Sequence, residues 1–571
     1  MAWTIGKTWN PTYVKNVIRE LRRFGSDTTL IECKRAGNGA YDDVYESIAA
    51  FANMPEGGVL LLGVDEVANF RISGVSNSRK MESEIVDKVR QAIKPAPQLN
   101  FFHISVEGRT VLVIEVIALA PHHKPATFRQ KAYLRQSDGD YIMNDNDKHM
   151  ILVEGLHERQ RVHYDTEVIV GTDKAELDSS FLSTYLKNAR TSNARLAQIT
   201  NDDQLLQIAG VTDREGQLRL GGLYALGFLP SAHFPSLAAT AAVRVQRDDS
   251  GVRNRNLQDF EGPIPVLLER TMEWVRQNIS QERAYGADGH MEIRPEFPMP
   301  AIRELLANAF VHRDLSPDSI DAGKRVEIRV FHDRVMIQSP GGLRGLSKSQ
   351  LESAELSKAA VNQRVYEIAK NLETTDGEPI IEGEGGGIPE VFYAMRRAGK
   401  PDPRFFDNGV TFTVNLLRAN RFDDDEMAWL SSLGVSLGWM QNEILIGLKR
   451  GERWSRVRAS KEFRMAKTHE VTNAIEGLLQ SGILEEVEDV LVLKQSQPNV
   501  GSDRAFDELG PNTGAIYAVV SAVGSTVADI VAASGLTDNQ VRYGLKQLLD
   551  AGAITMIGGR GIRNTLYTRS G

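Results

Sequence analysis

Residues 301–314 constrain the fold of this chain most strongly, because they combine a clear helical pattern with a pair of polar side chains. The apolar residues recur at helical spacing and would form one face: Ile302, Leu305, Leu306, Ala309 and Phe310. Glu304 and Asn308 are four residues apart and would share the opposite face. A helix packed on a sheet through its apolar stripe would therefore present a carboxylate beside a carboxamide.

Such a pair suits the chemistry of a nucleotide site. The amide oxygen of Asn308 can ligate Mg²⁺, and the carboxylate of Glu304 can orient an attacking water molecule. The alternative is an ordinary amphipathic helix whose Glu–Asn face is only solvated. The segments that follow in the chain favour the nucleotide site.

Two glycine-containing turns follow this helix. Residues 325–338 alternate between apolar and polar side chains, which predicts an antiparallel hairpin that runs into Ser339-Pro340-Gly341-Gly342. Further on, the glycine-rich stretch 383–387 comes just before Pro389 and an amphipathic segment. Glycines followed by a proline at a helix start place backbone N–H groups and the positive end of the helix at one point. Such an arrangement is typical of phosphate binding.

The segment 290–418 resembles the GHKL ATPase fold of gyrase and histidine kinases, and more closely its divergent form in bacterial Schlafen-type ATP-binding proteins. The resemblance implies a site for ATP and Mg²⁺, with Glu304 as the hydrolytic base and Asn308 as the Mg²⁺ ligand. The other nucleotide-binding positions that it implies are Gly341, Gly342, Asn362, Gly385, Gly386 and Gly387. The chain departs from the pattern at Ser339-Pro340, where many GHKL enzymes carry an Asp that reads the adenine.

The length and composition of the chain bound the remaining options. Its 571 residues are enough for three or four domains, and 42% hydrophobic with 25% charged residues is typical of a globular protein. The net charge of −8 means that any nucleic-acid binding must depend on local basic patches. With Cys33 as its single cysteine, the chain has no disulfide framework. It has no apolar run long enough for a bilayer and no signal peptide at its start, which predicts a cytoplasmic protein without a membrane segment.

The N-terminal segment shows the order strand, helix, strand, with these elements expected at 30–34, 41–53 and 58–64. Alternation along the first strand puts Glu32 and Lys34 on one face. Cys33 lies on the other face, where a buried thiol is expected rather than a nucleophile.

This segment resembles the Schlafen core domain, also described as an Alba-type DNA-binding module, through Glu32-Cys33-Lys34, residues 47–53 and residues 57–66. Related positions in animal Schlafens form a three-carboxylate nuclease. The resemblance implies these catalytic candidates here: Asp27, Glu32 and either Asp65 or Glu66, with Lys34 beside them and Glu32 as a metal ligand. Such a set could hold divalent ions against a phosphodiester, provided that Asp27 lies in the turn before the strand. The alternative is a Glu32–Lys34 pair that only orders a binding surface.

The end of this segment, 128–135, is a predicted strand with a basic face. Alternation places four residues on that face: Arg129, Lys131, Tyr133 and Arg135. Cationic side chains with an aromatic ring can neutralise phosphates and stack a base, so these residues are candidates for nucleic-acid contact. A solvated edge strand, charged to prevent aggregation, is the alternative.

Residues 156–290 carry no pattern that indicates chemistry. Helical periodicity comes first, and two apolar segments at 221–230 and 238–245 are then predicted to be strands. We therefore expect a connector or scaffold here.

Two helix–turn–helix patterns follow residue 420. In the first, residues 449–467 hold eight basic and two acidic residues, with these candidates for nucleic-acid contact: Arg453, Arg456, Arg458 and Lys461. In the second, Thr537 precedes a helix at 538–549, and two strands follow in the order of a winged helix. Its candidates are Asn539, Gln540, Arg542, Tyr543, Lys546, Arg560 and Arg563. Winged helices also serve as protein–protein modules, which is the alternative.

Together these segments predict a multidomain protein of α/β and α+β class with five parts: a Schlafen/Alba-like domain at 1–155, a connector at 156–290, a GHKL-like ATPase at 291–420, a winged-helix-like domain at 421–497 and a winged helix at 511–571. The expected function is an ATP-binding and ATP-hydrolysing transcriptional regulator that binds nucleic acid, DNA in preference to RNA, as a homodimer or larger oligomer, with its DNA binding or its assembly switched by ATP. The alternatives are an ATP-gated, metal-dependent nuclease that cuts tRNA or DNA in phage defence, and a protein whose outer domains are interaction modules.

Overall fold

The computed structural model is a multidomain α/β protein with two compact units, Met1–Trp429 with Lys461–Met465, and Leu430–Ser460 with Ala466–Gly571. The structure describes these residues: 9–24, 27–28, 30–36, 42–136, 139–154, 162–245, 254–285, 291–343, 350–351, 361–381, 387–494, 512–521, 524–534, 536–551, 553–557 and 565–569. Within the first unit we call residues 9–154 the N-terminal region and residues 162–417 the central region.

The N-terminal region is built on a four-stranded sheet with the order β1-β2-β7-β6. These strands are β1 (Ile31–Lys34), β2 (Gly58–Leu62), β6 (Leu99–Val106) and β7 (Arg109–Val116). Strand β1 runs parallel to β2, and the other pairs are antiparallel. Helix α2 (Asp42–Asn53) connects the two parallel strands, so the predicted order of strand, helix and strand is confirmed.

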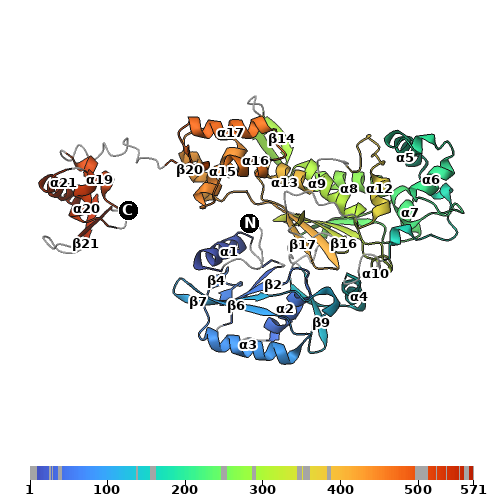
Figure 1. Cartoon of the computed structure of the whole chain (residues 1–571), viewed down its shortest axis with the longest axis horizontal. Coiled ribbons are helices and arrows are strands. Elements are labelled where there is room, and N and C mark those ends of the chain that lie inside the picture. The colour runs from blue at the N-terminus through green and yellow to red at the C-terminus, as the bar shows by residue number, and fades with distance from the viewer. Residues whose placement is uncertain are drawn as a thin grey trace. The chain divides into compact units, whose positions relative to one another are not determined.

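Helices cover both faces of this sheet (Figure 1). Alternate residues of β2 point to opposite sides: Val59 and Leu61 pack with helix α1 (Pro11–Phe24), and Leu60 and Leu62 pack with α2 and with α3 (Ser78–Ala92). Cys33 is buried on the α1 side, as predicted for a core thiol. A sheet that is covered on both faces explains why β2 is apolar along its whole length.

Shorter elements complete the N-terminal region. They are the hairpin β3 (Val64–Asp65) with β4 (Arg71–Ile72), helix α4 (Asp145–Glu154), and a second sheet of β5 (Ile93–Lys94), β8 (Thr127–Phe128), β9 (Lys131–Gln136) and β10 (Gly139–Ile142). The side chain of Asn53 at the end of α2 donates to the backbone oxygens of Ala126 and Tyr133, at 3.0 and 2.9 Å. The bond to Tyr133 holds β9 against α2, and the bond to Ala126 fixes the residue just before β8.

The central region contains a six-stranded sheet with the order β12-β11-β15-β16-β18-β17. Its strands are β11 (Ala239–Arg244), β12 (Asn254–Phe260), β15 (Val326–Val330), β16 (Arg334–Pro340), β17 (Arg404–Asp407) and β18 (Thr411–Leu417). The hairpin predicted within 325–338 is confirmed as β15 and β16. The first two strands, β11 and β12, come from the segment that the sequence presents as a connector, and β11 pairs in parallel with β15.

Helices lie on one face of the six-stranded sheet (Figure 1). The helices of this layer are α8 (Ile264–Asn278), α9 (Met299–Val311) and α13 (Ile388–Arg397). The remaining elements around the sheet are the hairpin β13 (Gln281–Tyr285) with β14 (Met291–Pro295), and helices α10 (Pro317–Ile320) and α12 (Gln363–Ala369).

One prediction for the central region is wrong. The segment predicted as a strand at 221–230 forms helix α7 (Leu220–Leu226), which packs near α5 (Ser179–Ser192) and α6 (Asp202–Ala209). Every residue of α7 is buried, so the segment lacks the polar positions that reveal a helical period. Gly222 allows a close approach, because a Cβ atom there would lie 2.4 Å from the backbone oxygen of Val211.

The rest of the chain is helical with short hairpins. Helix α14 (Asp424–Ser432) is followed by α15 (Trp439–Lys449), α16 (Arg456–Glu462), α17 (Thr468–Gln480), β19 (Leu484–Val487) and β20 (Val490–Leu493). After residues outside the described part come α19 (Thr513–Val519), α20 (Val527–Ser534), α21 (Asp538–Asp550), β21 (Ile554–Ile557) and β22 (Leu566–Arg569). Helices α15, α16 and α17 precede the antiparallel pair β19–β20, and α19, α20 and α21 precede the antiparallel pair β21–β22.

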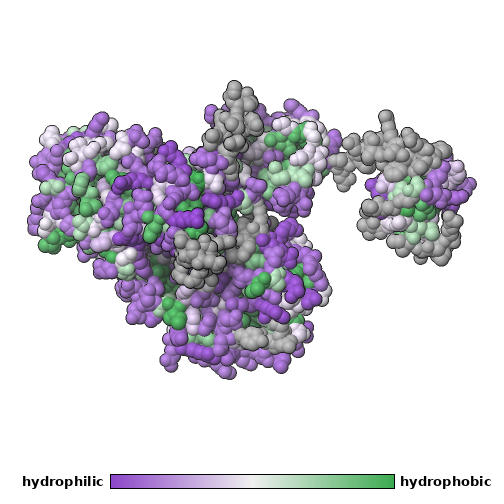
Figure 2. Space-filling model, turned by 180° about the vertical axis from the view of Figure 1, so that it is seen from behind, coloured by the Kyte–Doolittle hydropathy of each residue, from purple (hydrophilic) through white to green (hydrophobic). Residues whose placement is uncertain are grey.

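On the face seen in Figure 2, hydrophilic residues predominate and hydrophobic ones lie in small scattered groups. The most exposed large apolar side chains include Val67, Val170 and Phe228, which come from different parts of the chain. Among the helices whose residues are described, none combines the length and the apolar character needed to cross a membrane.

Candidate functional site

Helix α9 carries the polar pair that the sequence singles out. Its apolar residues at helical spacing, among them Ile302, Leu306 and Phe310, are fully buried against the sheet and its neighbouring helices. Glu304 and Asn308 are only half-buried. The amphipathic pattern therefore turns the carboxylate and the carboxamide away from the core, as predicted.

Glu304 and Asn308 contact each other directly. The side-chain nitrogen of Asn308 donates to Glu304 Oε1 at 2.6 Å and to the Glu304 backbone oxygen at 2.7 Å. Both bonds use the amide nitrogen, so the amide oxygen keeps its capacity to ligate a cation. The pair is thus preorganised with the carboxylate and the amide oxygen at one spot.

Gly387 lies against this pair. It directly precedes α13, with φ 69° and ψ −157°, a conformation that is accessible essentially to glycine only. A Cβ atom built on Gly387 would lie 3.9 Å from Glu304 Oε1. The amino end of α13, with Pro389 in its first turn, is therefore directed close to Glu304 and can offer backbone N–H groups to an anion. Gly385 and Gly386, the other predicted lid residues, lie outside the described residues.

The first glycine turn follows β16. Gly341 has φ 91° and donates its N–H to the Val410 backbone oxygen at 2.7 Å. A Cβ atom built on Gly341 would lie 2.7 Å from Asp314 Cβ. A Cβ atom built on Gly342 would lie 2.6 Å from Asp407 Oδ1. Both glycines are therefore required for close packing between the segment after α9 and the β17–β18 turn.

Two neighbours of the glycine turn hold α9 in place. Ser339, which stands where many GHKL enzymes carry an adenine-reading Asp, is buried and donates its hydroxyl to the Ala309 backbone oxygen at 2.9 Å. Asn362 donates its side-chain N–H groups to two backbone oxygens at the end of α9, those of Val311 at 3.0 Å and Arg313 at 2.7 Å. These donors anchor the end of the helix that carries Glu304, and contact of Asn362 with the nucleotide stays a prediction.

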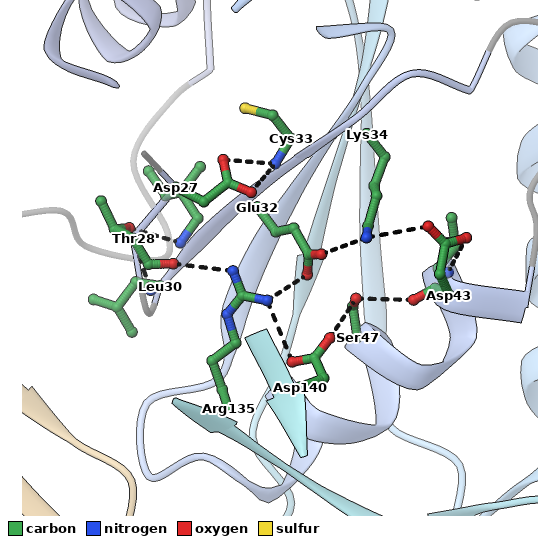
Figure 3. Close-up of polar contacts among 12 residues, drawn as sticks. Asp27, Thr28, Leu30, Glu32, Cys33, Lys34, Asp43, Ser47, Arg135 and Asp140 are labelled. Atoms are coloured by element: carbon green, nitrogen blue, oxygen red, sulfur yellow. Dashed lines mark hydrogen bonds and ion pairs between the residues drawn. The ribbon is translucent and has the colours of Figure 1, made fainter. Parts of the chain in front are cut away.

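A second polar site lies in the N-terminal region, around Glu32 (Figure 3). Glu32 is 4% exposed and lies between two cations, with Lys34 Nζ at 2.7 Å and Arg135 at 2.9 Å. Arg135 also contacts Asp140 at 3.3 Å, and Ser47 donates its hydroxyl to Asp140 at 2.7 Å. We call Glu32, Lys34, Arg135 and Asp140 the buried charge cluster.

The sequence reasoning missed Asp140 and Ser47. Asp140 lies directly opposite Arg135 in the β9–β10 hairpin, so the two form a cross-strand pair. The signal that could have revealed it is the sequence Ser137-Asp138-Gly139, because residues of these types predict a hairpin turn that would bring the flanking segments together. Lys34 has a further partner in Asp43, at 3.1 Å, which the reasoning also missed.

Asp27 lies in the turn before β1, which is the placement that a shared site with Glu32 requires. Both of its carboxylate oxygens accept the Cys33 backbone N–H at 3.1 Å, and its own N–H donates to Glu66 at 3.3 Å. Burial, followed by the nearby Glu66 carboxylate, raises the pKa of Asp27 to about 7.

The predicted carboxylates are not gathered into one metal site. Glu32 is paired with two cations, and Asp65 faces Arg35 at 3.8 Å. Within the described ranges, no group of three or more His, Cys, Asp or Glu side chains is arranged to hold a metal ion. The Glu32–Lys34 ion pair that the alternative interpretation requires is present.

The predicted basic face at 128–135 is wrong. Arg129 lies in the β8–β9 turn with φ 50° and pairs with Asp42 at 2.7 Å, and only Lys131 is an exposed strand residue. Tyr133 is buried and donates to Glu46 at 3.0 Å, and Arg135 is 4% exposed. The physical reason is that β9 packs on α2, so the strand is covered on the side that alternation alone would leave open.

The candidates of the first helix–turn–helix segment are partly neutralised. Arg456 pairs with Glu476 at 2.8 Å and with Glu486 at 2.9 Å, which holds its pKa above the usual value. Arg458 pairs with Glu452 and lies over the Trp454 ring, 4.6 Å from its centroid. Arg453 and Lys461 are exposed.

The candidates on α21 lie on one exposed face of that helix: Asn539, Gln540, Arg542, Tyr543 and Lys546. Gln540 accepts the Thr537 N–H at 2.9 Å and thereby caps the start of the helix, and Arg542 pairs with Asp538 at 2.6 Å. The opposite face, including Val541, Leu545 and Leu548, is buried. Arg560 and Arg563 lie outside the described residues.

Two family models match the chain. Residues 27–144 match the family described as "Schlafen, AlbA_2", and residues 323–416 match the family described as "Putative ATP-dependent DNA helicase recG C-terminal". The chain carries a Schlafen-type segment and an ATPase-like segment. The second match includes both glycine turns but begins after α9, so Glu304 and Asn308 lie outside it.

Two solved structures are similar to this chain. One is the DIP2311 protein from Corynebacterium diphtheriae, with 17% identity, coverage of 98% of this chain and 99% of that one, and a TM-score of 0.37. The other is the N-terminal domain of a protein described as related to the helicase RecG, from Nitrosomonas europaea, with 23% identity, coverage of 24% and 92%, and a TM-score of 0.20. None of the curated proteins matches the chain.

The raised pKa of Asp27 predicts a pH-dependent stability. The folded protein retains a proton on Asp27 that the unfolded chain releases between about pH 4 and pH 7, so this residue lowers the free energy of unfolding as the pH rises through that window. Asp27→Asn removes the ionisable group. The melting temperature of this variant minus that of the wild type should therefore become more positive as the pH is raised from 4 to 8. The exposed Asp87→Asn serves as the control, and parallel curves for Asp27→Asn and the wild type would contradict the prediction.

Proposed function

We propose that this chain is a nucleic-acid-binding regulator that binds and hydrolyses ATP in its central region. The observation that carries the proposal is the position of Gly387, at the amino end of α13, directly against the Glu304–Asn308 pair of α9. The proximity of a helix amino end, a carboxylate and a carboxamide supports a nucleotide site here. The match of residues 323–416 to an ATPase-like family supports the same assignment.

Each group at this spot has a distinct task in the proposal. The N–H groups at the start of α13 would bind the phosphates of ATP. Asn308 would hold Mg²⁺ through its amide oxygen, because carboxamide oxygens are hard ligands that suit this ion. Glu304 would orient and deprotonate the attacking water, and its bond from Asn308 keeps the carboxylate directed to the helix surface.

Nucleic acid is the partner that the proposal assigns to the outer parts of the chain. The match to the Schlafen, AlbA_2 family supports this role for the N-terminal region. Near the C-terminus, the order α19, α20, α21, β21, β22 is that of a winged helix, and α21 presents Asn539, Tyr543 and Lys546 on its exposed face. ATP would change the affinity for nucleic acid, or the assembly of the chain into a homodimer or larger oligomer.

The geometry around Glu32 favours a binding role over nuclease activity for the N-terminal region. A nuclease would need Glu32 to hold a divalent ion, but Lys34 and Arg135 already neutralise this carboxylate. We therefore assign the buried charge cluster to the organisation of this region rather than to cleavage.

Replacement of Glu304 tests the ATPase. Glu304→Ala should lower Mg-ATP turnover by about 10²- to 10⁴-fold, because it removes the group that activates water. Glu378→Ala, which removes an exposed carboxylate of the same region, is the matched control and should retain full turnover. Duplex DNA should stimulate the wild type and not Glu304→Ala. Equal turnover of Glu304→Ala and the wild type would contradict the assignment.

The salt dependence of binding tests the role of α21. Lys546→Ala should weaken binding to duplex DNA and lower the slope of log K against log salt concentration by about 1, because one phosphate contact is lost. Lys187→Ala, which removes an exposed lysine of the central region, is the control. An unchanged slope in Lys546→Ala would remove α21 from the interface.

A further inference from the structure

The turn between β17 and β18, residues 407–410, contacts both the first glycine turn and the N-terminal region. We call it the 407–410 turn. It belongs to the six-stranded sheet of the central region, because β17 and β18 are its last two strands. Its four residues make contacts in two directions, toward the glycine turn and toward the N-terminal region.

On one side, the 407–410 turn fixes the glycine turn after β16. Gly341 donates its N–H to the Val410 backbone oxygen at 2.7 Å, and Leu343 donates its N–H to Asp407 Oδ2 at 3.0 Å. Gly342 packs so closely that a Cβ atom there would lie 2.9 Å from the Cα atom of Gly409. A displacement of Gly341 and Gly342 must therefore move the 407–410 turn with it.

On the other side, the same turn enters the N-terminal region. Asn408 is 7% exposed and donates its side-chain N–H to the Arg135 backbone oxygen at 3.1 Å. Val410 is 3% exposed, and its side chain belongs to the apolar core that includes Phe51, Leu134 and Ile151. The turn is thus fixed to β9 by a hydrogen bond and to the core beneath it by apolar packing.

Asn408 also makes the turn rigid. Its side-chain oxygen accepts the N–H groups of Val410 at 3.0 Å and Thr411 at 2.8 Å. The oxygen therefore shapes the turn, and the nitrogen crosses to Arg135. The two tasks are chemically separable, because an aspartate in this position would keep the acceptor and lose the donor.

Arg135 joins this contact to the buried charge cluster. Its backbone oxygen accepts from Asn408, and its guanidinium holds Glu32 and Asp140. Since buried ion pairs depend strongly on geometry, a small shift of the Arg135 backbone changes how Glu32 is neutralised.

We propose that nucleotide occupancy of the site between α9 and α13 is transmitted through Gly341, Gly342 and the 407–410 turn to Arg135, and through Arg135 to the buried charge cluster of the N-terminal region. Asn408 is the positioning residue of this link. The inference rests on the proposed function, because it requires ATP bound beside α9 to displace the glycine turn, which Ser339 and Asp314 connect to the carboxyl end of α9. It adds the route by which the ATPase regulates the nucleic-acid-binding region.

A second joint between the same two regions provides a control. Asp318 of α10 contacts His149 of α4, and Lys324 contacts Asp147 of α4 at 3.1 Å. These contacts hold the regions together without the glycine turn or the 407–410 turn. Asp318→Asn therefore weakens the joint while it leaves the proposed link intact.

Hydrogen–deuterium exchange of the full chain tests the link. The probe is the Mg²⁺ complex of the non-hydrolysable analogue adenylyl imidodiphosphate, and the readout is amide exchange in peptides that cover 131–136. In the wild type and in Asp318→Asn, the analogue should change the amide exchange rates of residues 131–136 by about fivefold. This is the effect expected for the gain or loss of one hydrogen bond. In Asn408→Asp this change should be lost, while binding of the analogue persists. If Asn408→Asp does not fold, Val410→Ala provides the test instead. It removes only apolar packing and should reduce the change in exchange rate that the analogue causes.

The outcomes separate the link from the function on which it rests. If the wild type does not bind the analogue, both the proposed function and the link are overturned. If the wild type binds it and exchange at 131–136 stays constant, or if Asn408→Asp and Val410→Ala keep the full change, the link alone is overturned and the ATPase assignment stands.

Discussion

The packing of α9 on the six-stranded sheet is the constraint on which the proposed ATP site depends. Burial of each large apolar side chain of this helix contributes about 1.5–3 kcal/mol, far more than an exposed polar pair can contribute. The apolar face therefore dictates the rotation of the helix, and Glu304 and Asn308 are turned outward as a consequence. Ser339 and Asn362 then fix the end of α9 through backbone oxygens. The polar site is positioned by the core rather than by its own contacts.

The N-terminal region presents the opposite situation, because charges themselves are buried. Removal of one partner of a buried ion pair costs about 3–5 kcal/mol, since it leaves a charge without water or counter-ion. Glu32, Arg135 and Asp140 must therefore act as a set. Among the described residues Arg135 Nε has no hydrogen-bond partner, and the guanidinium lies 5.5 Å from the centroid of the Phe51 ring. A cluster of this kind is sensitive to small movements of the Arg135 backbone, which the Asn408 contact controls.

The predictions that succeeded came from local periodicity. The alternation along 325–338 and the helical spacing of 301–314 depend on neighbours in sequence, and both elements are present in the structure. The helix α7 was missed, because a segment buried on all sides has no polar positions that reveal its period. The burial of Tyr133 and Arg135 depends on α2, which local alternation does not report. The contact of Asn408 with Arg135 joins residues 273 positions apart and leaves no local signal.

The site itself could be predicted in part. The residue types at Glu304 and Asn308 indicate a nucleotide site because their spacing puts them on one helix face, and the structure brings Gly387 to the same place. Asn362 and Ser339 could not be interpreted from the sequence, because both use their polar atoms on the backbone around the end of α9. Their role is visible only once the distances are known.

Isothermal titration calorimetry with adenylyl imidodiphosphate tests the central claim most directly, in the presence of Mg²⁺ and after its removal by a chelator. The account predicts that the wild type binds the analogue more tightly with Mg²⁺, and that Asn308→Ala, which lacks the amide oxygen, loses this dependence while it retains weak binding. An absence of binding by the wild type, or an equal effect of Mg²⁺ on both proteins, would contradict the account.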